Sequence, residues 1–387
     1  MTELTFRGNP SLHGENSIVG DWLRTVDRWS LGALLLLVTL GLVLALAASP
    51  PLAHKNGLWT YHYVIRHVVF VMMGLGTIAA VSMCSVATAR RLGIVMFLVA
   101  LAATIALPWF GTDFGKGATR WYSLGFFSLQ PSEFLKPGFV VASAWLMAGS
   151  FERFGPPGRT LTGLAALGIA AMLAMQPDFG QAMLLLAVLA TMVFVSGAPI
   201  VVLLAFGGLI GAGGAFAYFN SSHFASRIDS YLAAEVDPHT QLAYAQAAIR
   251  EGGLFGVGAA QGSVKWTLPD AHTDFIVAVA AEEFGLILTV ILIGLYLFIT
   301  VRALGRLMDE RTPFIRLAGT GLAVLFGLQA FINMAVAIRL LPAKGMTLPF
   351  ISYGGSSMLA AAIAMGVLLA LTRARRSDMA TEFRSAV

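Results

Sequence analysis

An acid and a base lie one helical turn apart where a long apolar segment begins. Glu133 follows Gln130, Pro131 and Ser132, and Lys136 comes three residues later. That spacing places both charges on one face of a helix. A charged pair inside an apolar segment is costly, so it indicates a site for a charged substrate. The alternative is a structural device, in which Pro131 starts the helix, the acid faces its amino terminus and the lysine reaches the membrane surface. The spacing leaves both interpretations open.

A single carboxylate stands at the start of another apolar run. Asp274 follows His272 and Thr273 and precedes the unbroken apolar stretch 275–281. An acid at such a partly buried position could serve as a general base. The alternative is a helix N-cap, a role that either Thr273 or Asp274 could fill. Taken alone, the local sequence favours the cap.

Two more acids lie deeper in the same apolar segment. Glu282 and Glu283 follow Asp274 by eight and nine residues, which is roughly 12–14 Å along a helix. Acids at that depth indicate an ion or proton path, or a buried pair that locks two helices together. The lock is the favoured interpretation, with Arg339 or Arg66 as the candidate partner.

Several cations converge from the loops that surround these acids. Fixed Arg and Lys side chains suit a diphosphate, because they bind it and stabilise the charge that builds as it leaves. Contact with lipid headgroups is the alternative. No basic block with interleaved aromatics occurs, so we expect no nucleic-acid partner. The converging cations are Arg120, Lys136, Arg227, Arg250, Lys265, Arg339 and Lys344.

The composition indicates that these residues belong to a membrane protein. Hydrophobic residues make up 57% of the 387 residues and charged residues 12%, where a soluble domain has about 25% charged. Uncharged runs recur that are long enough to cross a bilayer, which takes about 20 residues. We predict an all-α polytopic membrane protein of about ten transmembrane helices, near residues 30–50, 63–83, 91–109, 130–149, 161–176, 181–198, 200–219, 274–301, 315–340 and 353–372.

The arginines orient this bundle, because most of them flank one set of alternate loops. By the positive-inside rule that side is the cytoplasm, which places both termini there. The lysines Lys55, Lys116, Lys136, Lys265 and Lys344 fall on or near the opposite side. An excess of cations against the topological bias indicates an anionic partner outside.

Spans seven and eight are joined by a large extracytoplasmic loop, 221–273. Asp237 and Pro238 resemble the start of a helix, and Gly252-Gly253 resembles its end, which predicts a helix near 238–250.

The lone cysteine, Cys84, excludes an internal disulfide. The polar N-terminus is too long for the charged start of a signal peptide, so we expect the first span to be retained. We predict three parts: a cytoplasmic tail (1–28), the membrane domain (29–373) and a second cytoplasmic tail (374–387).

Five sequence blocks, read in order, resemble the SEDS family of bacterial cell-wall proteins. The resemblance covers essentially the whole chain after residue 28. One departure is the stretch 259–262, where the family more commonly has glycine and serine. The blocks are Thr119-Arg120-Trp121 with Gln130-Pro131-Ser132-Glu133 and Lys136; 176–180 (QPDFG); 252–258 (GGLFGVG); 268–275 (LPDAHTDF) with Glu282-Glu283; and 341–357 (LPAKGMTLPFISYGGSS).

The resemblance implies ten spans and an enzyme that polymerises lipid II, a lipid-diphosphate-linked disaccharide pentapeptide, into glycan strands on the outer membrane face. The stretch 344–347 is more similar to the division members of the family than to its elongation members. The family therefore implies a role in septal wall synthesis, at the division site of the bacterial inner membrane.

The resemblance also assigns roles to individual residues. It implies that Asp274 is the essential acid, which shifts the interpretation from a cap to catalysis. It implies that Glu133 and Lys136 are required, and that Arg120 and Trp121 border the same cavity. Further residues that could shape this cavity or bind substrate are Asp178, Arg227, Lys265, His272 and Lys344, with Glu282 and Glu283 in a structural or proton-path role.

The expected reaction starts when Asp274 accepts the proton of an acceptor hydroxyl, which then attacks the donor sugar and expels its lipid diphosphate. Lys136, Arg120 and Lys265 would hold the diphosphate. A divalent cation, Mg²⁺ or Mn²⁺, could assist there, although no ligand cluster in the sequence requires one.

Two other functions compete with this one. A lipid II flippase would show paired repeats and polar groups at the bilayer midplane, and a division scaffold would not need the Asp274 carboxylate. The family implies a class B penicillin-binding transpeptidase and other divisome proteins as partners.

Overall fold

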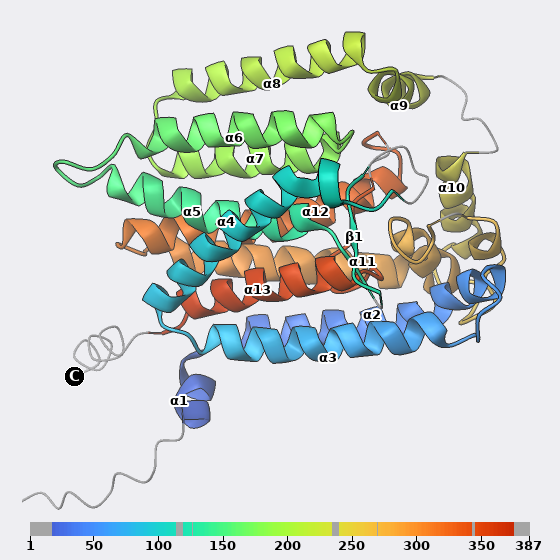
Figure 1. The fold of residues 1–387 in the computed structure, drawn as a ribbon. Coiled ribbons are helices and arrows are strands. Elements are labelled where there is room, and N and C mark those ends of the chain that lie inside the picture. Colours follow the sequence, from blue (N-terminus) through green and yellow to red (C-terminus); the bar gives the residue numbers. More distant parts are fainter. Residues whose placement is uncertain are drawn as a thin grey trace, which may run out of the picture.

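The computed structural model is a bundle of long helices that run roughly along one axis (Figure 1). It describes residues 18–113, 119–125, 127–233, 240–268, 270–342 and 345–374. The helices of the bundle are α2 (Arg28–Lys55), α3 (His62–Ser82), α4 (Val86–Phe110), α5 (Pro131–Gly149), α6 (Gly158–Met175), α7 (Phe179–Val195), α8 (Ile200–Asn220), α11 (Ile276–Met308), α12 (Pro313–Ala337) and α13 (Gly355–Leu371).

Each predicted span coincides with one of these helices. In the described part of the chain, seven of them are long and apolar enough to cross a membrane: α2, α3, α4, α6, α8, α11 and α12. Helices α7 and α13 are apolar but shorter, and α5 carries Glu133 and Lys136. The chain is therefore a multi-pass, all-α membrane protein, and the number of spans stays a prediction.

The centre of the bundle is formed by α5, α12 and α13. Most residues of these three helices are buried, including Glu133, Lys136, Gln329 and Asn333. At the other extreme, α8 has no buried residue and lies at the edge of the bundle in Figure 1. The buried polar side chains of α5 and α12 are therefore surrounded by protein.

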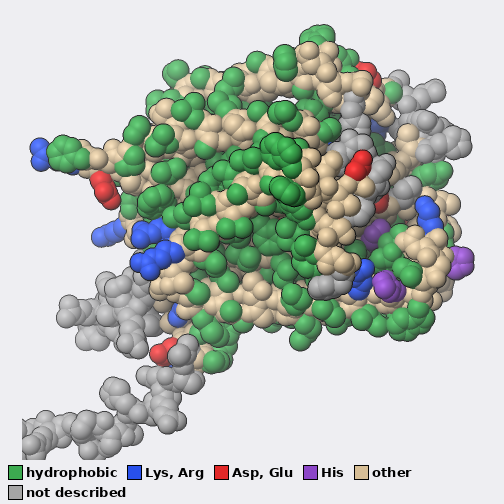
Figure 2. Space-filling model, in the orientation of Figure 1, with side chains coloured by type: hydrophobic (Ala, Val, Ile, Leu, Met, Phe, Trp, Pro, Cys, Tyr) green, Lys and Arg blue, Asp and Glu red, His purple; other side chains and the backbone are tan. Residues whose placement is uncertain are grey.

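The described chain begins and ends at one end of the bundle, where the amide of Ala374 donates to the carbonyl of Thr25 at 3.0 Å. In the same region Arg302 binds both carboxylate oxygens of Asp27, at 2.7 and 2.8 Å. Figure 2 shows hydrophobic side chains over the middle of the bundle and charged ones towards its ends. The side of the membrane on which this end of the bundle lies stays a prediction.

The large loop after α8 contains more helix than the sequence predicts. The predicted helix near 238–250 is α10 (Gln241–Gly252), which is capped by the Thr240 hydroxyl and followed by Gly253 at φ 52°. Asp237 and Pro238 lie outside the described residues. The predictions missed α1 (Ile18–Thr25), α9 (Ser222–Leu232) and the short 3₁₀ turn η2 (Val264–Trp266).

Helix α11 differs from its prediction at both ends. It starts at Ile276, with Phe275 at the N-cap position, so the prediction that Thr273 or Asp274 occupies the N-cap is wrong. It also continues to Met308, beyond the predicted end at 301, and is interrupted at Gly285, where φ is 76° and ψ −173°. This break is the point where the outer loop packs against the helix.

Candidate active site

Glu133 and Lys136 form a buried ion pair on the first turns of α5. Pro131 lies in the first turn of that helix, where a missing amide hydrogen costs nothing. The Lys136 Nζ lies 2.9 Å from Glu133 Oε2, and the two side chains are 2% and 6% exposed. The predicted spacing thus produces the predicted pair, and the lysine is buried in the protein.

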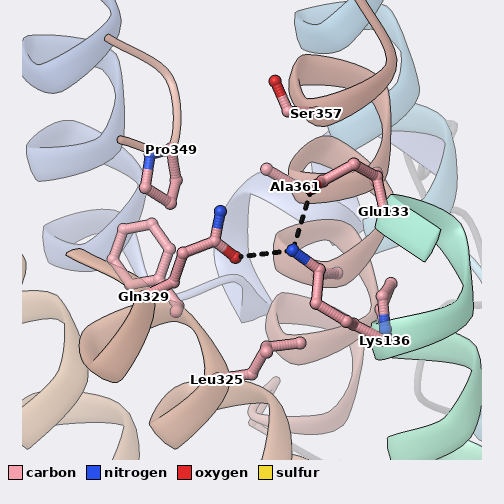
Figure 3. A pocket seen from close by; sticks show the side chains of 11 residues that line it. Glu133, Lys136, Leu325, Gln329, Pro349, Ser357 and Ala361 are labelled. Carbon is pink, nitrogen blue, oxygen red and sulfur yellow. Dashed lines mark hydrogen bonds and ion pairs between the residues drawn. The ribbon is translucent and has the colours of Figure 1, made fainter. Parts of the chain in front are cut away.

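Two amide side chains complete the hydrogen bonds of this pair. Gln181 on α7 donates to Glu133 Oε1 at 2.8 Å, and Lys136 Nζ donates to Gln329 Oε1 on α12 at 3.2 Å. Figure 3 shows the ammonium group between Glu133 and Gln329. The cavity beside them, about 20 Å³ in volume, has room for one water molecule. We call Glu133, Lys136, Gln181 and Gln329 the charge-pair cluster.

Asp178 lies near this cluster, in the turn between α6 and α7. It is 7% exposed, and Gln130 Nε2 lies 3.5 Å from its Oδ2. Burial raises the pKa of Asp178 to about 6, Arg120 and Lys136 oppose that rise, and Glu133 adds to it. The structure therefore brings four predicted site residues into one electrostatic environment.

Arg120 is anchored to the same turn. Its Nε donates to the carbonyl of Gln176 at 2.7 Å and its Nη2 to that of Pro177 at 2.8 Å. Trp121, the next residue, is half-buried, and its carbonyl accepts from Thr112 at 2.8 Å. The arginine thereby holds the loop after α4 against the α6–α7 turn.

A short hairpin links Trp121 to α5. Strands β1 (Tyr122–Ser123) and β2 (Ser128–Leu129) pair antiparallel. Ser356 at the start of α13 donates to the carbonyl of Ser128 at 2.7 Å and accepts from the amide of Gln130 at 3.0 Å. The segment that precedes Glu133 is therefore held both by the strand pairing and by Ser356.

Asp274 is half-buried in the turn that leads into α11. The 345–354 loop, which precedes α13, packs on this turn. A side chain added at Gly345 would place its Cβ 3.2 Å from Asp274 Oδ2. The glycine therefore lets the loop approach the carboxylate closely.

Hydrogen bonds fix the backbone on both sides of Asp274. The amide of Tyr353 donates to the carbonyl of His272 at 2.9 Å, and Ser352 Oγ donates to that of Thr273 at 2.5 Å. Asn333 Nδ2 on α12 donates to the carbonyl of Asp274 itself at 2.9 Å. Three successive carbonyls are thus hydrogen-bonded, so the backbone that carries the Asp274 carboxylate is fixed in position.

The His272 ring lies among aromatic residues. Its centroid is 5.8 Å from that of Tyr353 and 6.3 Å from that of Tyr63 on α3. The side-chain amide nitrogen (Nδ2) of Asn56 donates to the Tyr63 hydroxyl at 2.7 Å. His272 therefore joins the Asp274 turn to the linker between α2 and α3.

Glu282 and Glu283 bind the outer loop, and not a neighbouring helix as the favoured interpretation expected. Glu283 forms an ion pair with Lys265 of η2, where Arg339 or Arg66 was expected. Glu282 Oε1 accepts from the amide of Val264 at 2.7 Å. Both acids are at most 1% exposed. The partner comes from the loop because the loop folds back onto α11.

Glycines allow that close approach. A Cβ at Gly252 would lie 1.8 Å from the Ala281 carbonyl oxygen, and one at Gly262 would lie 2.8 Å from the Glu282 carboxyl carbon. In the stretch 259–262, which departs from the family pattern, Ala260 has φ 64° and its amide donates to Glu283 Oε2 at 2.9 Å. The departure therefore keeps the backbone conformation that a glycine adopts easily.

The remaining predicted cations do not gather around one point. Arg339 Nη2 donates to the carbonyls of Tyr231 and Ala233 at 3.1 and 2.6 Å, and Arg250 is exposed at the end of α10. Lys344 and the side chain of Arg227 lie outside what the structure describes. Among the described cations, Arg120 and Lys136 are the ones whose charges act on Asp178.

The described residues contain no group of three or more His, Cys, Asp or Glu side chains that could hold a metal ion. The Glu133 carboxylate already binds Lys136 and Gln181. The side chains present therefore do not fit a metal cage made by protein alone.

Sequence reasoning missed the neutral residues of the site. These are Gln181, Gln329, Asn333 and Ser352. Buried amides within apolar helices are costly unless they are hydrogen-bonded. The presence of Gln329 and Asn333 in an apolar segment could therefore have indicated that both have polar partners.

Comparisons with known proteins agree with this architecture. A solved structure described as the structural coordination of polymerization and crosslinking by a peptidoglycan synthase complex matches with a TM-score of 0.75 and 27% identity, over 90% of this chain and 97% of that chain. The rod shape determining protein RodA of Thermus thermophilus matches with a TM-score of 0.66 and 25% identity, over 91% and 98%.

Curated relatives and a family match identify the group. A protein of Caulobacter vibrioides is 42% identical over 93% of each chain, and one of Trichlorobacter lovleyi is 33% identical over 86% of this chain and 89% of that relative. Both are named probable peptidoglycan glycosyltransferase FtsW. Residues 28–377 match the family described as Cell cycle protein, FtsW/RodA/SpoVE. The chain therefore belongs to this family, the SEDS family that its sequence blocks resemble.

Proposed function

We propose that this chain is a peptidoglycan glycosyltransferase that polymerises lipid II into glycan strands during septal cell-wall synthesis. A relative that is 42% identical over 93% of this chain is named probable peptidoglycan glycosyltransferase. The observation that carries the proposal is the fixed Asp274 turn, because three hydrogen bonds to successive backbone carbonyls and an adjacent glycine position its carboxylate just before α11.

Asp274 is the general base in this proposal. It accepts the proton of the 4-hydroxyl of the acceptor sugar as that oxygen attacks C1 of the donor sugar. The new glycosidic bond forms while the bond from C1 to the diphosphate oxygen breaks, and the lipid diphosphate leaves with the electron pair. A carboxylate with a fixed backbone suits this step, since general-base catalysis depends on geometry first.

Lys136 and Arg120 stabilise the leaving diphosphate. Both act on the acidic turn at Asp178, and preformed positive charge lowers the barrier to the departure of an anion. Trp121, the half-buried residue that follows Arg120, is the candidate to stack on a sugar ring. Arg227, His272 and Lys344 are further candidates for substrate contact, whereas Lys265 is committed to Glu283.

A divalent cation, Mg²⁺ or Mn²⁺, would be held by the diphosphate oxygens, since the Glu133 and Asp178 carboxylates already have protein partners. When bound there, it would neutralise leaving-group charge.

The flippase alternative loses its main support. It depended on Glu282 and Glu283 as groups within the membrane, and both bind the 260–265 segment of the outer loop instead. We therefore propose no second function.

We place the catalytic face outside the bacterial cytoplasmic membrane, with both termini inside and the protein at the division septum. A class B penicillin-binding transpeptidase would crosslink the strands, with other divisome proteins around it. The likeness to a chain of a peptidoglycan synthase complex supports such a partner.

The test is polymerisation of labelled lipid II by purified protein with its cognate transpeptidase. Asp274→Asn keeps the size of the side chain and removes the base, so we expect strand synthesis to fall by at least about 1,000-fold. Asp229→Asn is the matched control, because it makes the same change at an exposed position on α9 and should leave the rate unchanged. Equal activity of wild type and Asp274→Asn would rule out Asp274 as the base.

A further inference from the structure

Two neutral amides on α12 lie between the two charged parts of the site. Gln329 and Asn333 are four residues apart, so they share one face of the helix. They are 7% and 3% exposed. Each contacts one of the two parts, and each also contacts the loop that covers Asp274.

Gln329 uses both ends of its amide group. Its Oε1 accepts from Lys136 Nζ at 3.2 Å, and its Nε2 donates to the carbonyl of Thr347 at 3.1 Å. Figure 3 shows this side chain reaching across from α12 to the lysine. Glutamine suits the position because it offers an acceptor to an ammonium group and a donor to a carbonyl at once.

Asn333 uses its nitrogen twice. Its Nδ2 donates to the carbonyl of Asp274 at 2.9 Å and to that of Met346 at 2.6 Å. Both partners are carbonyl oxygens, so the amide nitrogen must face them and the orientation of the side chain is determined. An aspartate of the same shape would place an acceptor against two acceptors.

The two amides therefore bind successive carbonyls, those of Met346 and Thr347, at the start of the 345–354 loop. The same loop places Gly345 against the Asp274 carboxylate and binds the carbonyls of His272 and Thr273. Gln329 thus links Lys136 to Thr347, and Asn333 links the adjacent residue Met346 to the backbone carbonyl of Asp274. The Met346–Thr347 peptide joins the two sets of hydrogen bonds.

We propose that Gln329 and Asn333 are positioning residues that fix the Lys136 ammonium group and the Asp274 carboxylate relative to each other. This inference rests on the proposed function, in which Lys136 holds the leaving diphosphate and Asp274 takes the proton. In-line displacement needs the base and the leaving-group cation on opposite sides of the reacting carbon, so an error of about 1 Å in their separation costs up to about 100-fold in rate.

The first test measures binding without catalysis. Undecaprenyl diphosphate is titrated into the full-length protein and into Gln329→Met, Lys136→Met and the double variant. Gln329→Met should weaken binding about 10-fold, and the double variant should bind no more weakly than Lys136→Met alone, since the glutamine acts through the lysine. Independent, multiplying losses, or unchanged binding by Gln329→Met, would overturn the proposal for Gln329.

The second test measures strand synthesis with lipid II and the cognate transpeptidase. Asn333→Asp should lower kcat by about 10- to 100-fold and leave KM within about twofold, because it displaces the base and not the diphosphate site. A rise in KM with kcat unchanged, or full activity, would contradict a role through Asp274.

Controls separate positioning from folding. Thr320→Val removes another buried polar group on α12, roughly 13 Å from Gln329 along the helix, and should keep both binding and rate. If Gln329→Met does not fold, Gln329→Glu replaces it: the glutamate still accepts from Lys136 but cannot donate to Thr347, so it too should weaken binding. A wild-type protein that binds the diphosphate but makes no strands would refute the proposed function while the binding cycle still tests Gln329.

Discussion

Two buried Glu–Lys ion pairs lie in the described part of the chain, one at the charge-pair cluster and one at the outer loop. Glu133 and Lys136 are 6% and 2% exposed, and Glu283 and Lys265 are 0% and 3% exposed. The first pair binds side-chain amides of α7 and α12 beside a small cavity. The second binds a backbone amide of the outer loop, whose glycines allow it to pack closely against α11. Burial alone therefore does not distinguish a functional pair from a structural one, and the identity of the additional partners does.

The largest expected effect comes from breaking the outer-loop pair. Lys265→Met leaves the Glu283 carboxylate buried without its cation, which should destabilise the protein by about 3–5 kcal/mol. Glu283→Gln combined with Lys265→Met removes both charges and should recover most of the stability and the polymerase activity. Thermal unfolding in detergent measures both variants. If the single variant is as stable as the double one, the ion pair is not what holds the loop.

The same double replacement at the charge-pair cluster should have the opposite outcome. Glu133→Gln with Lys136→Met removes the charges together, so the protein should fold, but the cation for the diphosphate is lost. We expect the rate of strand synthesis to fall about 100-fold, equivalent to about 2.7 kcal/mol of transition-state stabilisation. Retained synthesis, as expected for the outer-loop pair, would make the two pairs equivalent and remove Lys136 from the mechanism.

The acid beside the cluster gives a pH signature. Burial raises the pKa of Asp178 to about 6, so between about pH 4 and pH 6 the folded chain keeps a proton that the unfolded chain releases. Stability therefore falls as pH rises through this window and stays lower above it. Asp178→Asn should stabilise the protein at pH 7.5 by on the order of 2 kcal/mol and hardly change it at pH 4. Unfolding temperatures at the two pH values test this, and an equal shift at both would show that the carboxylate is ionised throughout.

The smallest effect concerns the glycine beside each acid. A Cβ at Gly345 would lie 3.2 Å from Asp274 Oδ2, whereas one at Gly262 would lie 2.8 Å from the Glu282 carboxyl carbon. Gly345→Ala should therefore lower the rate of strand synthesis by less than about tenfold, through a slight displacement of the base. Its unfolding temperature should stay close to that of wild type, while Gly262→Ala should lower it more. A Gly345→Ala protein that unfolds early at normal activity would reverse the comparison.

Hydrophobic runs were sufficient to predict where the helices lie, because a segment that crosses a bilayer must satisfy its own backbone hydrogen bonds as a helix. The same reasoning predicted Glu133 with Lys136, since a spacing of three is a property of one helix. Helix ends were less predictable. Thr273 and Asp274 looked like caps for α11, but the helix starts later, with Phe275 at the N-cap position.

Contacts between distant segments could not be predicted from spacing. Lys265 and Glu283 are 18 residues apart and meet because the outer loop folds back on α11. Arg120 contacts carbonyls 56 and 57 residues away, although its sequence position indicates a substrate-binding cation. Gln329 and Asn333 were missed because the search considered charged residues and these two are neutral. Two buried amides one turn apart in an apolar helix nevertheless need hydrogen-bond partners.

The Asp274 turn also has a consequence for how the protein is made. Two of the three groups that hold its successive carbonyls, Ser352 and Tyr353, lie about 80 residues further along the chain. During synthesis the turn is therefore complete only after the segment before the last helix has emerged from the ribosome. If the turn carries the base as proposed, a chain that stops after α12 should be inserted in the membrane without polymerase activity.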